Sequence, residues 1–269
     1  MSFKKTSKKA FTLIELSIVL IIIGLLIVAI TSGSSLIRNA KLRSITNEAK
    51  QYQVAVNSFY MKFDEYPGDF NQVLPDVEGS PPVEGDNDDI IEWSTGSVNE
   101  GSNAWLQLVA SKILPSDVAS GMTISDMLSQ STINTITPTK HFPASAENAA
   151  GWIFNAYEVN GIKTNYVQLV KSFSPGFGTE SLSAPIGTIT GTAAEGEGGA
   201  LTVSDAFSID NKNDDGVRTS GDIREVFVLS TVENNDCQKG NTTSNVDGKY
   251  ELTNSKENVC SLAFKITIN

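Results

Sequence analysis

The hydrophobic pattern of the chain is dominated by one uninterrupted apolar run near its start. Residues 11–30 read FTLIELSIVLIIIGLLIVAI and contain a single charged side chain, Glu15. At about 1.5 Å per residue, a helix of this length spans about 30 Å, the thickness of the hydrocarbon core of a bilayer. The pattern therefore predicts a transmembrane helix over residues 11–30.

Helical periodicity continues beyond this run, with apolar side chains on one face and charged side chains on the others. The apolar positions are Ile37, Ile45, Ala49, Tyr52, Val56, Phe59 and Phe63. We therefore expect one helix from Phe11 to Phe63, about 80 Å long, whose amphipathic half, residues 31–63, packs under a soluble head. Residues 31–35, TSGSS, are weak helix formers. They predict either a segment that stretches during packing or a simple bend at the membrane surface.

The rest of the chain, residues 64–269, is predicted to form a globular head. Pro67 and Gly68 mark the turn that ends the long helix. The predicted elements are helices at 103–113 and 201–210 and strands at 151–157, 166–172, 224–232 and 259–268, with a turn at Asn160-Gly161. Residues 75–102 are expected to be an exposed loop and residues 174–200 a mobile connection. The fold class is thus α+β, a long N-terminal helix packed on a head with an antiparallel sheet.

Composition excludes several functions. The 269 residues include 20 basic and 31 acidic side chains, a net charge of −11, which argues against nucleic acid as a main partner. A single histidine excludes His-rich metal sites and disfavours a hydrolase triad. Because no nucleotide-binding loop or catalytic motif is found either, we expect a protein that is not an enzyme.

The ten residues before the apolar run are basic, with four lysines and no acid. This charge predicts that the N-terminus stays in the cytoplasm and that the head is translocated. A secretory signal peptide would have a shorter apolar region that ends in a cleavage site. A plain signal anchor fits the length but gives no use to Glu15, because a charge inside the bilayer costs about 2.5–3.5 kcal/mol.

Residues 8–16, KKAFTLIEL, resemble the processing signal of type IV prepilins and type II secretion pseudopilins. The resemblance implies that a prepilin peptidase cuts between Ala10 and Phe11, removes the leader 1–10, and methylates the amine of Phe11. Ala10 departs from the Gly that usually precedes the cut. The resemblance also implies that Glu15 pairs with the Phe11 amine of a neighbouring subunit. In an isolated subunit we expect Glu15 to have no obvious partner, so pairing would favour assembly.

The same resemblance implies a function: a structural subunit of a type II secretion pseudopilus or a type IV pilus. Its partners would be membrane lipid, other pilin or pseudopilin subunits, the peptidase, and an inner-membrane assembly platform with its ATPase. The chain would cross the bacterial inner membrane once, with its head in the periplasm until it joins a fibre. Two alternatives stay open: a minor or tip pilin for adhesion, motility or DNA uptake, and a membrane-anchored binding protein or hydrolase of the outer face.

The two cysteines, Cys237 and Cys260, both fall in the head. Because the head is expected in an oxidising compartment, a disulfide between them is predicted, with two reduced thiols as the alternative.

Residues 210–222, DNKNDDGVRTSGD, can be aligned with an EF-hand loop and predict a Ca²⁺ site of modest affinity. The predicted ligands are Asn211, Asn213, Asp215, the carbonyl of Val217, and Asp222. Asp210 and Asp214 are possible substitutes, and an Asx-rich turn is the alternative. The acidic run 86–89 is a weaker candidate.

Overall fold

The computed structural model describes residues 11–72, 85–91, 100–118, 142–145, 150–159, 162–171, 188–193, 199–225, 227–230, 237, 248–250, 252 and 260–268. The chain divides into two compact units, Met1–Leu42 and Arg43–Asn269. The units are described separately.

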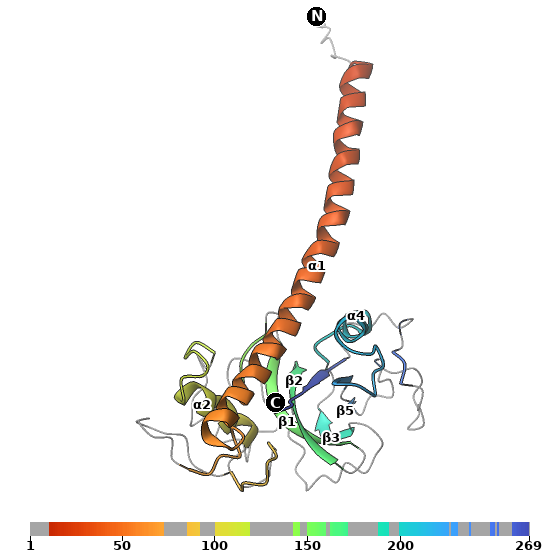
Figure 1. Cartoon of the computed structure of the whole chain (residues 1–269). Helices are drawn as coiled ribbons and strands as arrows, with labels where there is room; N and C mark the ends of the chain where they lie inside the picture. Colours follow the sequence, from red (N-terminus) through yellow and green to blue (C-terminus); the bar gives the residue numbers. More distant parts are fainter. Residues whose placement is uncertain are drawn as a thin grey trace, which may run out of the picture. The chain divides into compact units, whose positions relative to one another are not determined.

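Helix α1, Leu13–Phe63, contributes to both units (Figure 1). Its bounds confirm the single long helix predicted from the pattern. Residues 31–35 are helical without a break, so the low helix propensity of TSGSS is outweighed by the good helix formers on both sides. Stretching of this segment during packing stays a prediction.

Within the unit Arg43–Asn269, α1 buries one face of its periodic apolar pattern. Ile45, Ala49, Tyr52, Val56 and Phe59 are all 5% exposed or less. Their spacing of three or four residues places them on one side of the helix, as predicted. Ile37 was expected to join this row, but it belongs to the other unit and is exposed.

The head contains a four-stranded antiparallel sheet in the order β1-β2-β6-β4 (Figure 1). Its strands are β1 Gly151–Val159, β2 Ile162–Val170, β4 Ile223–Glu225 and β6 Leu262–Lys265. The α+β class with an antiparallel sheet is therefore confirmed. The predicted β1–β2 hairpin is also confirmed, although its turn, 160–161, lies outside the described residues.

Two helices of the head differ from their predicted bounds. Helix α2, Glu100–Ala110, begins inside the segment predicted as a loop, because its polar first turn is buried and gives no amphipathic signal. Helix α4, Val203–Asn213, starts and ends later than the predicted helix 201–210. Its start is fixed by Thr202, whose hydroxyl accepts a hydrogen bond from the Asp205 amide at 3.2 Å.

The strand predicted over 224–232 is wrong as a single element. Its residues form β4 and then β5, Phe227–Ser230, which belongs to a second sheet. There β5 pairs in parallel with β3, Thr188–Ala193, inside the segment predicted as a mobile connection. The sequence TITGTA is rich in β-branched residues, which favour a strand once a partner is present.

An aromatic cluster holds α1, α2 and β1 together in the core of the head. The Trp105 ring stacks on Phe154 with centroids 4.2 Å apart, and Tyr52 meets Trp105 edge-on at 4.8 Å. Trp105 and Phe154 are fully buried. Aromatic contacts of this geometry add to the free energy of area burial, so the cluster fixes the helix on the sheet.

Candidate functional site

The first turn of α1 forms a capping box around Glu15. The backbone N–H and the hydroxyl of Thr12 both donate to one Glu15 carboxylate oxygen at 2.8 Å, and the Glu15 amide donates to the Thr12 hydroxyl oxygen at 3.2 Å. Such a box satisfies amide groups that a helix start leaves without partners. The expectation that Glu15 lacks a partner in an isolated subunit is therefore wrong. The signal was present in the sequence as T-x-x-E, the usual capping-box pattern.

The surface of α1 after this box is apolar on every side. Large apolar side chains between residues 11 and 30 are mostly more than half exposed, including Phe11 at 88% and Leu13 at 89%. A helix that is apolar all round requires an apolar environment, either lipid or other helices. By length and composition, α1 qualifies as a membrane-spanning helix.

Glu48 anchors the second half of α1 to the sheet. Its Oε2 accepts hydrogen bonds from the indole N–H of Trp152 and from the hydroxyl of Ser145, both at 2.7 Å. Five residues further on, the Gln53 amide nitrogen donates to the Lys265 carbonyl at 2.7 Å. These polar contacts fix the register of the helix against β1 and against the end of β6.

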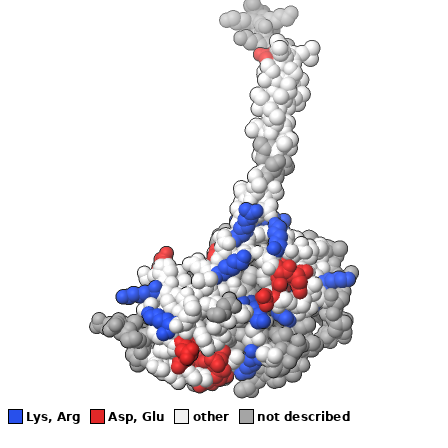
Figure 2. Space-filling model, viewed as in Figure 1, with Lys and Arg blue, Asp and Glu red and all other residues white. Residues whose placement is uncertain are grey.

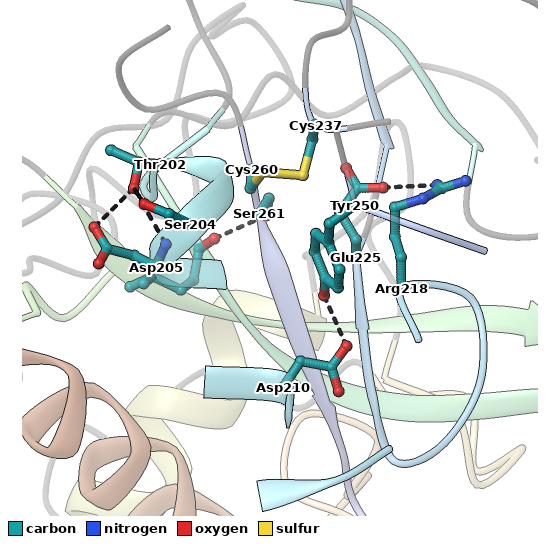
Figure 3. Close-up of a disulfide and its surroundings, with 11 residues drawn as sticks. Thr202, Ser204, Asp205, Asp210, Arg218, Glu225, Cys237, Tyr250, Cys260 and Ser261 are labelled. Carbon is teal, nitrogen blue, oxygen red and sulfur yellow. Dashed lines mark hydrogen bonds and ion pairs between the residues drawn. A yellow bond between two sulfur atoms is a disulfide. The ribbon is translucent and has the colours of Figure 1, made fainter. Parts of the chain in front are cut away.

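The two cysteines are joined as a disulfide, with their Cα atoms 5.2 Å apart (Figure 3). Cys260 also exchanges backbone hydrogen bonds with Leu201, at 2.9 and 3.0 Å. The bond therefore lies where the entrance to α4 meets the start of β6. Close by, a buried ion pair joins Arg218 and Glu225 at 3.0 Å (Figure 3).

The structure does not form the predicted EF-hand register. Asn211 and Asn213 belong to α4, and the Asn213 amide nitrogen donates to the Ile209 carbonyl at 2.7 Å. Asp222 lies 3.8 Å from the Lys265 ammonium. The helix is the physical reason, because residues at alternate positions of a helix do not converge on one ion.

The predicted substitutes lie together with Asp215. The carboxylate oxygens of Asp210, Asp214 and Asp215 lie within 4.8 Å of one another, at the end of α4. Asp214 accepts from the Ile223 amide at 2.8 Å, and Asp215 accepts from the Ser220 hydroxyl at 2.5 Å. Hard oxygen ligands in such a group suit Ca²⁺.

Asp210 is the buried member of this group (Figure 3). Its carboxylate accepts hydrogen bonds from the Tyr250 hydroxyl at 2.8 Å and from the Gly216 amide at 3.1 Å. Burial raises the pKa of Asp210 to about 6, although both hydrogen bonds lower it. A cation or a proton at this position would relieve the cost of the buried charge.

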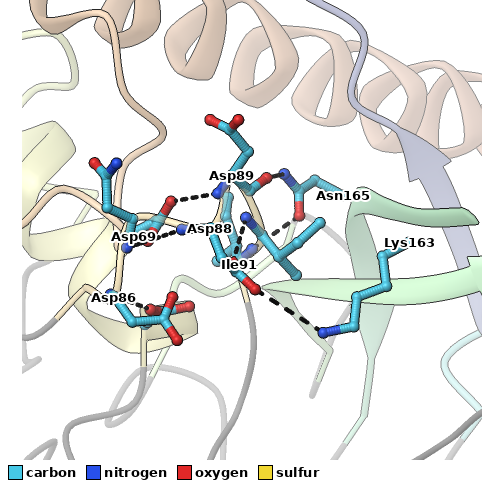
Figure 4. A network of polar contacts seen from close by, with 10 residues as sticks. Asp69, Asp86, Asp88, Asp89, Ile91, Lys163 and Asn165 are labelled. Carbon is cyan, nitrogen blue, oxygen red and sulfur yellow. Dashed lines mark hydrogen bonds and ion pairs between the residues drawn. The ribbon is translucent and has the colours of Figure 1, made fainter.

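A second acidic group lies between the end of α1 and the start of α2 (Figure 4). Asp69 accepts hydrogen bonds from the backbone amides of residues 87, 88 and 89, at 2.5, 3.3 and 2.8 Å. Burial raises the pKa of Asp69, and these amides oppose the rise. Asp69, Asp86 and Glu100 bring their carboxylate oxygens within 4.8 Å. The acidic run 86–89 was predicted as a weaker Ca²⁺ site. In the structure its backbone amides donate to Asp69, a residue that the sequence pattern did not single out.

Comparison with known proteins identifies the N-terminal segment. Residues 5–31 match the family model of the prokaryotic N-terminal methylation motif. No curated protein and no solved structure matches the chain. The match covers most of the leader, the Ala10–Phe11 junction and the apolar run, so the resemblance to the type IV prepilin-like signal is confirmed.

Proposed function

We propose that this type IV pilin-like chain is a structural subunit of a helical fibre, a type II secretion pseudopilus or a type IV pilus. One observation carries the proposal: the methylation motif at residues 5–31 leads directly into α1, whose first half exposes apolar side chains on all sides. Lipid covers this surface before assembly, and neighbouring α1 helices cover it in the fibre.

In this proposal a prepilin peptidase cuts between Ala10 and Phe11 and methylates the new amine. The amine then lies at the same end of α1 as Glu15, about one helical turn away. The Thr12 amide and hydroxyl already donate hydrogen bonds to the Glu15 carboxylate. A neighbouring amine would therefore not be the first partner of this charge. It adds to, or replaces, an existing hydrogen-bond partner. The gain from pairing is therefore smaller than the full cost of an unpaired intramembrane carboxylate.

The proposal also assigns a location and partners. The chain crosses the inner membrane once, with its N-terminus in the cytoplasm and its head in the periplasm. An assembly platform with its ATPase moves the subunit from the membrane into a homo- or hetero-oligomeric fibre. The chain has no catalytic role in this scheme.

Two experiments test the proposal. N-terminal sequencing of membrane-extracted protein should give methylated Phe11, and a chain that still begins at Met1 would overturn the proposal. Glu15→Leu should reduce recovery in sheared filaments while membrane fractionation stays normal. Ser17→Ala, which changes another polar side chain on the same part of α1, serves as the matched control. Normal filament recovery with Glu15→Leu would favour a membrane-anchored protein of another class.

We further propose that the head binds Ca²⁺ through Asp210, Asp214 and Asp215, in place of the EF-hand ligands. The proposal rests on the convergence of the three carboxylates and on the burial of Asp210. Millimolar Ca²⁺ should raise the melting temperature of the full chain by mass action, and Asp215→Asn should abolish the rise. Asp117→Asn changes an exposed carboxylate elsewhere in the head, and this control variant should keep the rise in melting temperature. If the melting temperature of the full chain does not change with Ca²⁺, the three carboxylates form a structural turn and the Ca²⁺ proposal is wrong.

A further inference from the structure

The second half of α1 presents a face to solvent that the head does not use. Arg43, Asn47, Lys50, Val54 and Met61 lie at spacings of three, four and seven residues, which places them on one side of the helix. All five are exposed, with Val54 at 63% and Met61 at 73%. We call this face, about 27 Å long, the helix stripe. It is basic at its N-terminal end and carries apolar side chains further along.

An acidic patch lies in the same unit, beyond the end of the helix. It consists of Asp64, Glu65, Asp86, Asp88 and Asp89. The two chain segments are held together because buried Asp69 accepts the amides of residues 87 to 89 (Figure 4). Lys163 lies 4.0 Å from Asp88 and offsets part of the charge. Figure 2 shows the acidic side chains of this face gathered in groups on the head, with basic side chains beside them.

We propose that the helix stripe of one subunit docks on the acidic patch of a second copy of this chain. Charge complementarity selects this occupant, because Arg43 and Lys50 offer two cations to a patch of carboxylates. The chain as a whole has a net charge of −11, so two copies repel unless positive and negative surfaces face each other. Docking would also cover Val54 and Met61, which are otherwise left in water.

The geometry of this contact determines what it builds. The stripe and the patch are different surfaces of one molecule, so after docking one copy still offers a free patch and the other a free stripe. Such a heterologous contact can repeat from copy to copy, and it builds an open filament when its rotation does not close into a ring. The inference thus rests on the proposed function and names the surface through which neighbouring heads meet.

Charge reversal in the full chain tests the contact. Arg43→Glu with Lys50→Glu should lower recovery in filaments, by about 1.4- to 5-fold for each exposed ion pair lost. Asp86→Lys with Asp88→Lys should do the same, and all four changes in one chain should restore recovery. Lys171→Glu, an exposed reversal outside both surfaces, is the matched control. An unchanged melting temperature of each variant shows that the head is folded.

A photo-crosslinking residue at position 47, which lies between Arg43 and Lys50 on the helix stripe, gives a readout that leaves both sets of charges intact. In filaments it should capture residues 64–65 or 86–89 of a second copy, identified by mass spectrometry. Filaments that form normally without this crosslink, or charge reversals that leave recovery unchanged, would overturn the contact while the proposed function stands. Capture of lipid or of a different protein would also overturn it. Failure of the unaltered chain to enter filaments would instead count against the proposed function.

Discussion

Asp210 should make the stability of the head depend on pH. Its carboxyl group is buried, and its pKa is raised from 3.8 to about 6. In the unfolded chain the same group ionises near its ordinary value. Between about pH 4 and pH 6 the folded chain therefore holds a proton that the unfolded chain has released.

The sign and size of the effect follow from this difference. The free energy of unfolding should fall as pH rises from 4 to 6, because ionising Asp210 costs more in the folded state. The interval between 3.8 and about 6 corresponds to at most about 3 kcal/mol, at about 1.36 kcal/mol per pH unit. Above pH 6 the group is ionised in both states, and its contribution to the pH slope ends. Asp210→Asn should remove this contribution.

Urea unfolding of the full chain in detergent micelles, followed by tryptophan fluorescence at pH 4.5, 5.5, 6.5 and 7.5, measures the effect. With a slope of about 2 kcal/mol per molar urea, the Asp210 contribution moves the midpoint by up to about 1.5 M. Burial also raises the pKa of Asp69 and Glu225, so the informative quantity is wild type minus variant at each pH. Asp117→Asn is the control. Midpoints of wild type and Asp210→Asn that shift in parallel would refute the argument.

Two further predictions concern contacts that fix the head. Glu48→Ala should lower the free energy of unfolding by about 1–3 kcal/mol, because the buried Trp152 N–H loses its acceptor; Glu48→Gln keeps an acceptor and should cost less in the same urea assay. Replacing Cys237 and Cys260 by Ser should lower the free energy of unfolding by about 2–4 kcal/mol. Reductant should lower the free energy of unfolding of the wild type by the same amount and leave that of the Ser variant unchanged. A Ser variant as stable as wild type would contradict the second prediction.

The elements predicted best were those with a strong local signal. The length of α1 followed from a pattern maintained from Phe11 to Phe63, and the β1–β2 hairpin followed from aromatic and β-branched runs on either side of a turn. The division between β4 and β5 depends on which strands they meet, β6 and β3, and those partners are distant in sequence. Local propensity carries no information about such a change of sheet.

The candidate sites show the same limit. The capping box at Thr12 and Glu15 could have been predicted from the sequence, because its two residues are three positions apart. Asp69 and Glu100 are brought together by tertiary structure, so no spacing rule could pair them. The EF-hand alignment failed for a local reason: α4 continues to Asn213 and converts the first two expected ligands into helix residues.

The order of strands in the sheet has a consequence for how the head is made. β6, the last described strand along the chain, lies between β2 and β4. Until Leu262–Lys265 emerges from the ribosome, β2 and β4 have no common partner and each presents an open edge to other chains. Folding of the four-stranded sheet therefore waits for Leu262–Lys265, and the contacts involved are far apart in sequence, which slows folding. A chain truncated before Leu262 would lose an interior strand of its sheet, and the unpaired edges of β2 and β4 would expose it to aggregation and to proteases.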